Sequence, residues 1–148
     1  MALTKVTSNV LADDAVTTGK ILDANVTTGK LAASSVTSIK VGTEFVTSSV
    51  LTPAATINVD YTAAQVFTLT PNANTTLNIT NPVIGVTKAI VVTGAGGSYT
   101  IAYTVGGSAG TFNKISGDYD DASGTKNFIQ ITCVSATEFW YTISQIAT

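Results

Sequence analysis

The residues best suited to chemistry in this chain are three aspartates in one short segment. Gly117-Asp118-Tyr119-Asp120-Asp121 places them within five residues, and carboxylate oxygens of this kind can bind Ca²⁺. The segment lacks the central glycine and the distal glutamate of the twelve-residue calcium loop. Two interpretations therefore stand: a weak calcium site at Asp118, Asp120 and Asp121, or an acidic loop in solvent.

The other residue types add no catalytic constellation. The chain contains no histidine and no arginine, which excludes Ser-His and Cys-His relays and an arginine clamp on phosphate. A pair of carboxylates could cleave a glycan. Glu44 and Glu138 are far apart in the sequence, and the aspartates that such an enzyme could use in principle are Asp118, Asp120 and Asp121. We therefore expect a protein that is not an enzyme and binds no cofactor.

Two further groups of residues have both a functional and a structural interpretation. Gly94-Ala95-Gly96-Gly97 joins two alternating segments with no helix after it, which indicates a hairpin turn rather than a nucleotide-binding loop. Aromatic side chains could stack on a sugar, although on β faces they more often lie in a core or an interface. The four candidates for glycan contact are Tyr99, Tyr103, Tyr119 and Trp140.

The elements that carry these residues follow a repeat at the start of the chain. From Val6, five blocks of ten residues run end to end, each opening with Val-Thr-Thr or Val-Thr-Ser and carrying an aliphatic residue at its sixth position. On a helix of about 3.6 residues per turn, a ten-residue shift would spread the apolar stripe around the cylinder. In a strand, positions five apart face opposite sides, so the pattern predicts short β arms separated by bends.

The repeat offers too little apolar surface to fold alone. Two aliphatic side chains per block contribute about 3–6 kcal/mol on burial, against about 1–2 kcal/mol for every residue that is ordered. Several chains winding around one axis, or one chain coiling as a β-solenoid, would supply the missing burial, and a disordered tail is the third alternative. We favour a homotrimer whose interface residues are Val6, Leu11, Val16, Ile21, Val26, Leu31, Val36, Val41, Val46 and Leu51.

After Pro53 the pattern changes to alternating strands. Turn-forming residues separate seven segments, 56–61, 66–70, 76–80, 89–93, 99–105, 128–134 and 139–146, a spacing that favours an antiparallel β-sandwich or jelly-roll-like domain. The chain is thus predicted to be all-β, with a repeat stalk at 1–53 and a sandwich at 54–148. Cys133 has no partner cysteine and is expected to be buried, while Trp140 points away from the core. The expected core is Ile57, Val59, Phe67, Leu69, Leu77, Ile79, Ile129, Ile131, Phe139, Tyr141 and Ile143.

Composition removes two classes of partner. The net charge of the 148-residue chain is −2 and its seven lysines are scattered, which leaves no basic patch to bind nucleic acid. Charged residues make up 11% of the chain, but no run approaches the roughly 20 apolar residues of a membrane span. We expect the apolar surface to be hidden in an assembly instead.

The decapeptides carry a resemblance to a known family. VTTGKILDAN and VTTGKLAASS, residues 16–35, resemble the VTTxKI repeats of bacteriophage tail fibres and related virion fibres. The stretch from Ile57 to Thr104, with its TTLNITN strand and glycine-rich hairpin, is similar to the β domains that end many such proteins. The resemblance implies an elongated homotrimeric virion component, attached to the head or tail at one end and exposing a β-rich domain at the other.

One departure from the family pattern narrows this expectation. Tail fibres usually begin with a dedicated attachment domain, whereas this chain enters its repeats within six residues. We therefore expect a head fibre, a capsid decoration protein or a short adaptor on the particle surface, bound to other virion proteins through its repeats, with the β domain as a candidate for host-glycan contact. The alternative is a bacterial cell-surface or carbohydrate-binding module in which the repeats are a spacer.

Overall fold

The computed structural model describes residues 21, 26–27, 31–32, 35–37 and 40–146. The chain divides into two units, Met1–Thr37 and Ser38–Thr148, and the second, called the β-domain below, contains every helix and strand of the described residues. A four-residue helix, α1 (Thr43–Val46), precedes nine strands. The strands are β1 (Ser48–Val50), β2 (Thr56–Asp60), β3 (Val66–Leu69), β4 (Thr75–Thr80), β5 (Thr87–Thr93), β6 (Ile101–Val105), β7 (Thr111–Ser116), β8 (Lys126–Cys133) and β9 (Glu138–Ile146).

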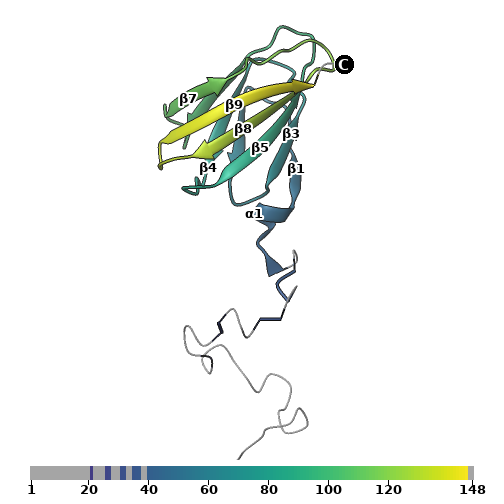
Figure 1. Ribbon diagram of the computed structural model, residues 1–148. Helices are drawn as coiled ribbons and strands as arrows, with labels where there is room; N and C mark the ends of the chain where they lie inside the picture. Colours follow the sequence, from purple (N-terminus) through teal and green to yellow (C-terminus); the bar gives the residue numbers. More distant parts are fainter. Residues whose placement is uncertain (1–20, 22–25, 28–30, 33–34, 38–39, 147–148) are drawn as a thin grey trace, which may run out of the picture. The chain divides into compact units, whose positions relative to one another are not determined.

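The nine strands form two sheets. Sheet A has six strands in the order β1-β3-β5-β8-β9-β7, and sheet B has three in the order β2-β4-β6. Figure 1 shows the strands of sheet A side by side in this order. The all-β fold class predicted from the sequence is confirmed.

The antiparallel pairing expected for a sandwich is wrong for most of this domain. Strands β1 to β6 alternate between the two sheets, and each of β1 to β4 pairs in parallel with the strand two further along. The chain therefore winds as a β-solenoid-like coil in which each turn adds one strand to each sheet. Antiparallel pairing occurs only where β8 meets β5 and β9, and β7 joins β9 in parallel.

The core lies between the sheets and follows the alternation of the strands. In β5, Ile90 and Val92 point inward and are fully buried, while Ala89 and Val91 face outward. Every predicted core residue is buried except Tyr141, which packs on the core while partly exposed, and Cys133 is buried as expected. Trp140 is 47% exposed, which confirms that it points away from the core.

The β-domain begins earlier than the expected boundary at Pro53. Strand β1 lies inside the last decapeptide block, and its residues Ser48 to Val50 pair with β3. The backbone N–H of Leu51 donates a hydrogen bond to the Thr68 carbonyl at 2.8 Å, and the Leu51 side chain is buried in the core. The last repeat block is thus part of the β-domain.

Candidate functional site

The predicted acidic segment borders an open cavity of about 490 Å³. The cavity lies between the β7–β8 loop, which contains the acidic segment, and the β5–β6 loop. The cavity is lined by Gly96, Ser98, Tyr99, Asp118, Tyr119, Asp120, Asp121, Ala122 and Gln145. Carboxylates, tyrosine rings and an amide therefore share this surface, a combination suited to polar ligands.

One carboxylate of the cavity, Asp121, binds the β5–β6 loop rather than facing solvent. Its two oxygens accept hydrogen bonds at 2.9 Å from the backbone N–H groups of Ala95, Gly97 and Tyr99, and at 2.7 Å from the Tyr119 hydroxyl. Burial raises the pKa of the Asp121 carboxyl, but these donors outweigh it and hold that pKa below its usual value. Asp121 thus fixes the β5–β6 loop against the acidic segment.

The same contact affects the Tyr119 hydroxyl. Burial, and then its hydrogen bond to Asp121, raise the pKa of Tyr119. The phenol is therefore held in its protonated form beside an ionised carboxylate. The Tyr119 hydroxyl therefore donates to Asp121 and does not act as a general acid or base.

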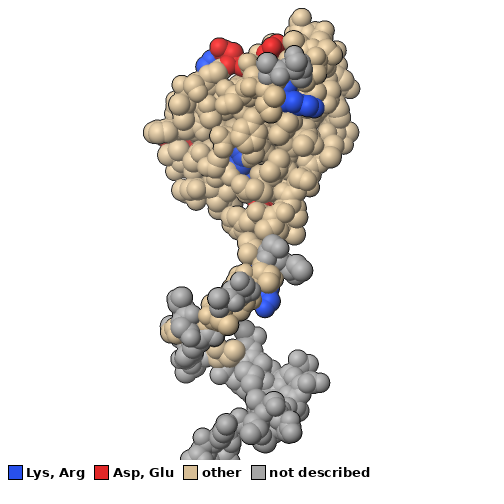
Figure 2. Space-filling model, turned by 45° about the vertical axis from the view of Figure 1, so that its right-hand side comes forward, with Lys and Arg blue, Asp and Glu red and all other residues tan. Residues whose placement is uncertain are grey.

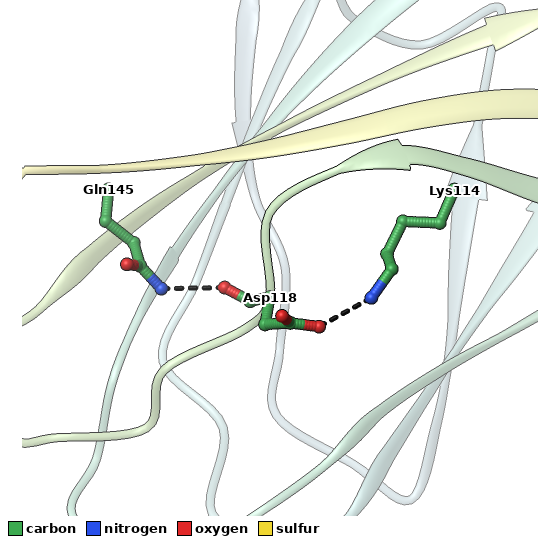
Figure 3. A network of polar contacts seen from close by, with 3 residues as sticks. All are labelled: Lys114, Asp118 and Gln145. Atoms are coloured by element: carbon green, nitrogen blue, oxygen red, sulfur yellow. Dashed lines mark hydrogen bonds and ion pairs between the residues drawn. The ribbon is translucent and has the colours of Figure 1, made fainter.

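Asp118 lies at the rim of the cavity. Its Oδ1 pairs with the Lys114 Nζ at 2.5 Å, and its backbone carbonyl accepts a 2.7 Å hydrogen bond from the Gln145 Nε2. Figure 3 shows the two partners approaching Asp118 from β7 and β9. The Asp118 side chain is 87% exposed, so this pair contributes little to stability.

A buried amide supports the segment from below. Asn127, on β8, is fully buried. Its Oδ1 accepts hydrogen bonds from the Asp120 backbone N–H at 2.9 Å and from Gln145, and its Nδ2 donates to the carbonyls of Asp120 and Val92. All hydrogen-bonding positions of the amide are used, so Asn127 holds the acidic segment on the sheet.

The backbone at the start of the segment requires glycine. Gly117 has a φ of 75°, and a Cβ at that position would lie 1.9 Å from the Ile143 carbonyl oxygen. Only a residue without a side chain can pass this close to β9 in a left-handed conformation.

The carboxylates do not converge on a metal position. Asp118 pairs with Lys114, the Asp120 Oδ1 accepts a hydrogen bond from the Ala122 N–H, and Asp121 faces the β5–β6 loop. Within the described part of the chain, no group of three or more His, Cys, Asp or Glu side chains is placed to hold a metal ion. The structure therefore does not bring Asp118, Asp120 and Asp121 together as the set of metal ligands considered from the sequence.

The four candidate sugar-stacking aromatics lie in three places. Tyr99 and Tyr119 line the cavity together. Tyr103 instead stacks on Phe112, with ring centroids 5.4 Å apart, and contacts Tyr141 in the interior. Trp140 lies on the outer face of sheet A, where its indole N–H donates to Glu138 at 2.9 Å. Of the four candidates for glycan contact, Tyr99 and Tyr119 are the two that line the cavity.

The predicted trimer-interface residues fall into three groups. Val6, Leu11 and Val16 lie outside the described residues. Leu51 is buried in the core of its own chain, so it offers little surface to a second one. The remaining six are exposed in the single chain, namely Ile21, Val26, Leu31, Val36, Val41 and Val46.

A buried lysine was not identified from the sequence. The Lys88 side chain is fully buried, donates a hydrogen bond to the Glu44 carbonyl of α1, and lies 5.4 Å from the Phe45 ring centroid. Burial lowers its pKa, although the charges of Glu44 and Asp60 oppose that shift. The sequence did hold a signal, because Lys88 is in phase with the inward-facing Ile90 and Val92.

Comparison with known proteins gives no relative for this chain: no family model, curated protein or solved structure matches it. In the described residues, no helix is long and apolar enough to cross a membrane.

Proposed function

We propose that this protein is a structural component of a virus particle, a homotrimeric phage fibre or capsid decoration. Its repeats bind the copies to one another and to other virion proteins, and the β-domain is exposed on the particle surface. It is not an enzyme, and it has no nucleic-acid or membrane partner. The resemblance of the decapeptides to virion-fibre repeats supplies the setting for this proposal.

One structural observation carries the proposal. Ile21, Val26, Leu31 and Val36 recur at repeat positions and are each between 44% and 57% exposed in the single chain. Aliphatic side chains at regular positions gain stability from burial, and further copies of the same repeat provide a matching surface. An intertwined trimeric stalk would bury these residues together.

A carbohydrate-binding module of a bacterial cell surface is the second candidate. The cavity favours it, because Tyr99 and Tyr119 line a surface that also carries exposed carboxylates and an amide. Aromatic rings beside polar groups are suited to sugar recognition. In a virion protein, the same surface would contact a host glycan.

Immunogold electron microscopy distinguishes the two candidates. Antibodies against the full chain would be applied to purified particles and to cells from a culture that produces it. We expect regular labelling of the particle surface. Labelling of cell envelopes with unlabelled particles would overturn the virion assignment in favour of the cell-surface module.

A further inference from the structure

Two adjacent rows on the outer face of sheet A are uncharged across five strands, and the charged Lys126 and Glu138 lie on the same face beyond these rows. The pairing registers place Val50, Thr68, Val91, Phe128 and Ser144 in one continuous row. Val50 is 83% exposed and Phe128 is 36% exposed. Most of the β-domain surface drawn in Figure 2 is likewise free of charged atoms.

A second row on this face has the same character. Val66 and Ala89 are neighbours on β3 and β5. The row continues to Ser48 on one side and to Gln130 and Thr142 on the other, all without a charge. The centres of protein interfaces are depleted of charged residues and enriched in aromatic ones. The two rows together, called the sheet A face below, share the lack of charge, and Phe128 is their one aromatic residue.

The outer face of sheet B is different. Asn58, Asn78 and Thr104 are aligned across its three parallel strands and joined by hydrogen bonds of 2.8 Å and 3.1 Å. Their amide and hydroxyl groups use one another as partners. The outer face of sheet B therefore carries a hydrogen-bonded polar row where the outer face of sheet A carries Val50, Val91 and Phe128.

The course of the chain indicates what covers the sheet A face. The last decapeptide block runs directly into β1, the edge strand of sheet A, and Val50 belongs both to that block and to the exposed row. Copies joined through the repeats are consequently joined at the edge of this face. The uncharged rows need no complementary charge on a partner, so the same rows of another copy can pack against them.

The size of the face fits the same occupant. Two rows about 6.6 Å apart on five strands about 4.8 Å apart cover roughly 300 Å². A stable independent interface buries about 800 Å² per partner. The face is too small to hold two copies alone, but it suffices when another segment keeps them at high effective concentration.

We propose that the sheet A face packs against the same face of the other copies in the trimer, so that the three β-domains meet through sheet A and leave sheet B and the cavity outward. This inference rests on the proposed homotrimer. It adds which surface of the β-domain is buried and which remains free for a ligand.

Cysteine accessibility in the full chain tests this packing. Val50→Cys reports on the sheet A face, and Thr56→Cys, exposed on the outer face of sheet B, is the matched control. The native Cys133 is fully buried, so the unaltered chain gives the background labelling. Maleimide labelling rates would be measured beside the molar mass from light scattering, and Phe128→Cys would be treated with a short bismaleimide.

We expect a trimeric mass and covalent oligomers of Phe128→Cys. We also expect Val50→Cys to be labelled roughly tenfold more slowly than Thr56→Cys, a factor that corresponds to about 1.4 kcal/mol of protection. A trimeric mass with equal labelling rates and no cross-linked oligomers would overturn the packing while leaving the trimer intact. A monomeric mass would overturn the trimer and, with it, this inference.

Discussion

Asp121 shows how one side chain holds two loops together at the cavity. A carboxylate that accepts several N–H donors is stabilised in its ionised form, and Asp121 accepts three from the β5–β6 loop and one hydroxyl from Tyr119. Its neighbour Asp118 has one lysine partner in solvent. The two aspartates therefore differ in their effect on stability, although they are only three residues apart.

Replacing these two residues separates their roles. Asp121→Asn keeps the shape but cannot accept all four hydrogen bonds, so we expect the free energy of unfolding to fall by about 1–3 kcal/mol. Asp118→Asn, the matched control, should change it by less than about 1 kcal/mol. Urea unfolding followed by circular dichroism measures both, and equal losses for the two variants would contradict the assigned geometry.

The pKa of Asp121 adds a pH dependence with a definite sign. Because the folded protein holds this pKa below the ordinary value of 3.8, the stabilisation is complete above 3.8 and is lost as the pH falls below it. The melting-temperature difference between the unaltered chain and Asp121→Asn should therefore shrink between pH 5 and pH 3. A difference that widens toward acid would show that the pKa of Asp121 is raised instead.

At the scale of elements, the parallel strands of sheet B are joined by side chains as well as by backbone. Asn78 on β4 is buried, donates to Asn58 on β2 and accepts from the Thr104 hydroxyl and the Gly107 N–H. Stacked polar side chains at equivalent positions maintain the register of the coil. One residue thus connects all three strands of the sheet.

Asn78→Ala should be costly for this reason. It leaves the Gly107 N–H and the neighbouring side chains without their partner, so we expect a loss of about 1–3 kcal/mol in the free energy of unfolding. Thr76→Ala, on the same face of the same strand, is the control and should lose less than half as much. Similar losses in thermal or urea unfolding would mean that the hydrogen bonds of Asn78 do not support the coil.

The sequence predicted most strands but not how they pair. Alternation identified seven segments that correspond to strands. It did not reveal their pairing, because an inward-facing apolar residue at every second position looks the same in parallel and antiparallel sheets. A signal for parallel register was present, because Thr56-Ile57-Asn58-Val59 and Thr76-Leu77-Asn78-Ile79 repeat and pair in register. The seven strands found in this way are β2, β3, β4, β5, β6, β8 and β9.

The missed elements have physical explanations. Strand β7 carries a register shift between Lys114 and Ser116, which breaks the alternation on which the prediction depended. Strand β1 has only three residues and lies inside the repeat. At the cavity, the acidic segment was recognised, but Asp121 binds backbone groups more than twenty residues away, and no local pattern indicates such partners.

At the scale of the whole molecule, the proposed assembly would determine which apolar side chains are removed from water. Ile21, Val26, Leu31 and Val36 are exposed in one copy, and an assembly through the repeats would remove them from water. The sheet A face would follow them into the interface, leaving the cavity outward. Trimer formation is therefore the basis of both the proposed stalk and the proposed display of the β-domain.

Ile21→Asp tests the role of the aliphatic positions. If these residues line a shared axis, the change places three like charges close together in an apolar setting, at a cost of several kcal/mol per ion. We expect the variant to lose the trimer in sedimentation velocity while its far-ultraviolet spectrum keeps the β signal. Thr27→Asp, at an exposed neighbouring polar position, should assemble normally, and an Ile21→Asp trimer as stable as the unaltered one would remove Ile21 from the axis.

The most direct test of the central claim is the molar mass of the full chain in solution, measured by size exclusion with multi-angle light scattering over a dilution series. A homotrimer gives about 45 kDa, three times the 15.1 kDa of one chain, and the account predicts that this value persists on dilution. A mass of 15.1 kDa at every concentration would contradict it.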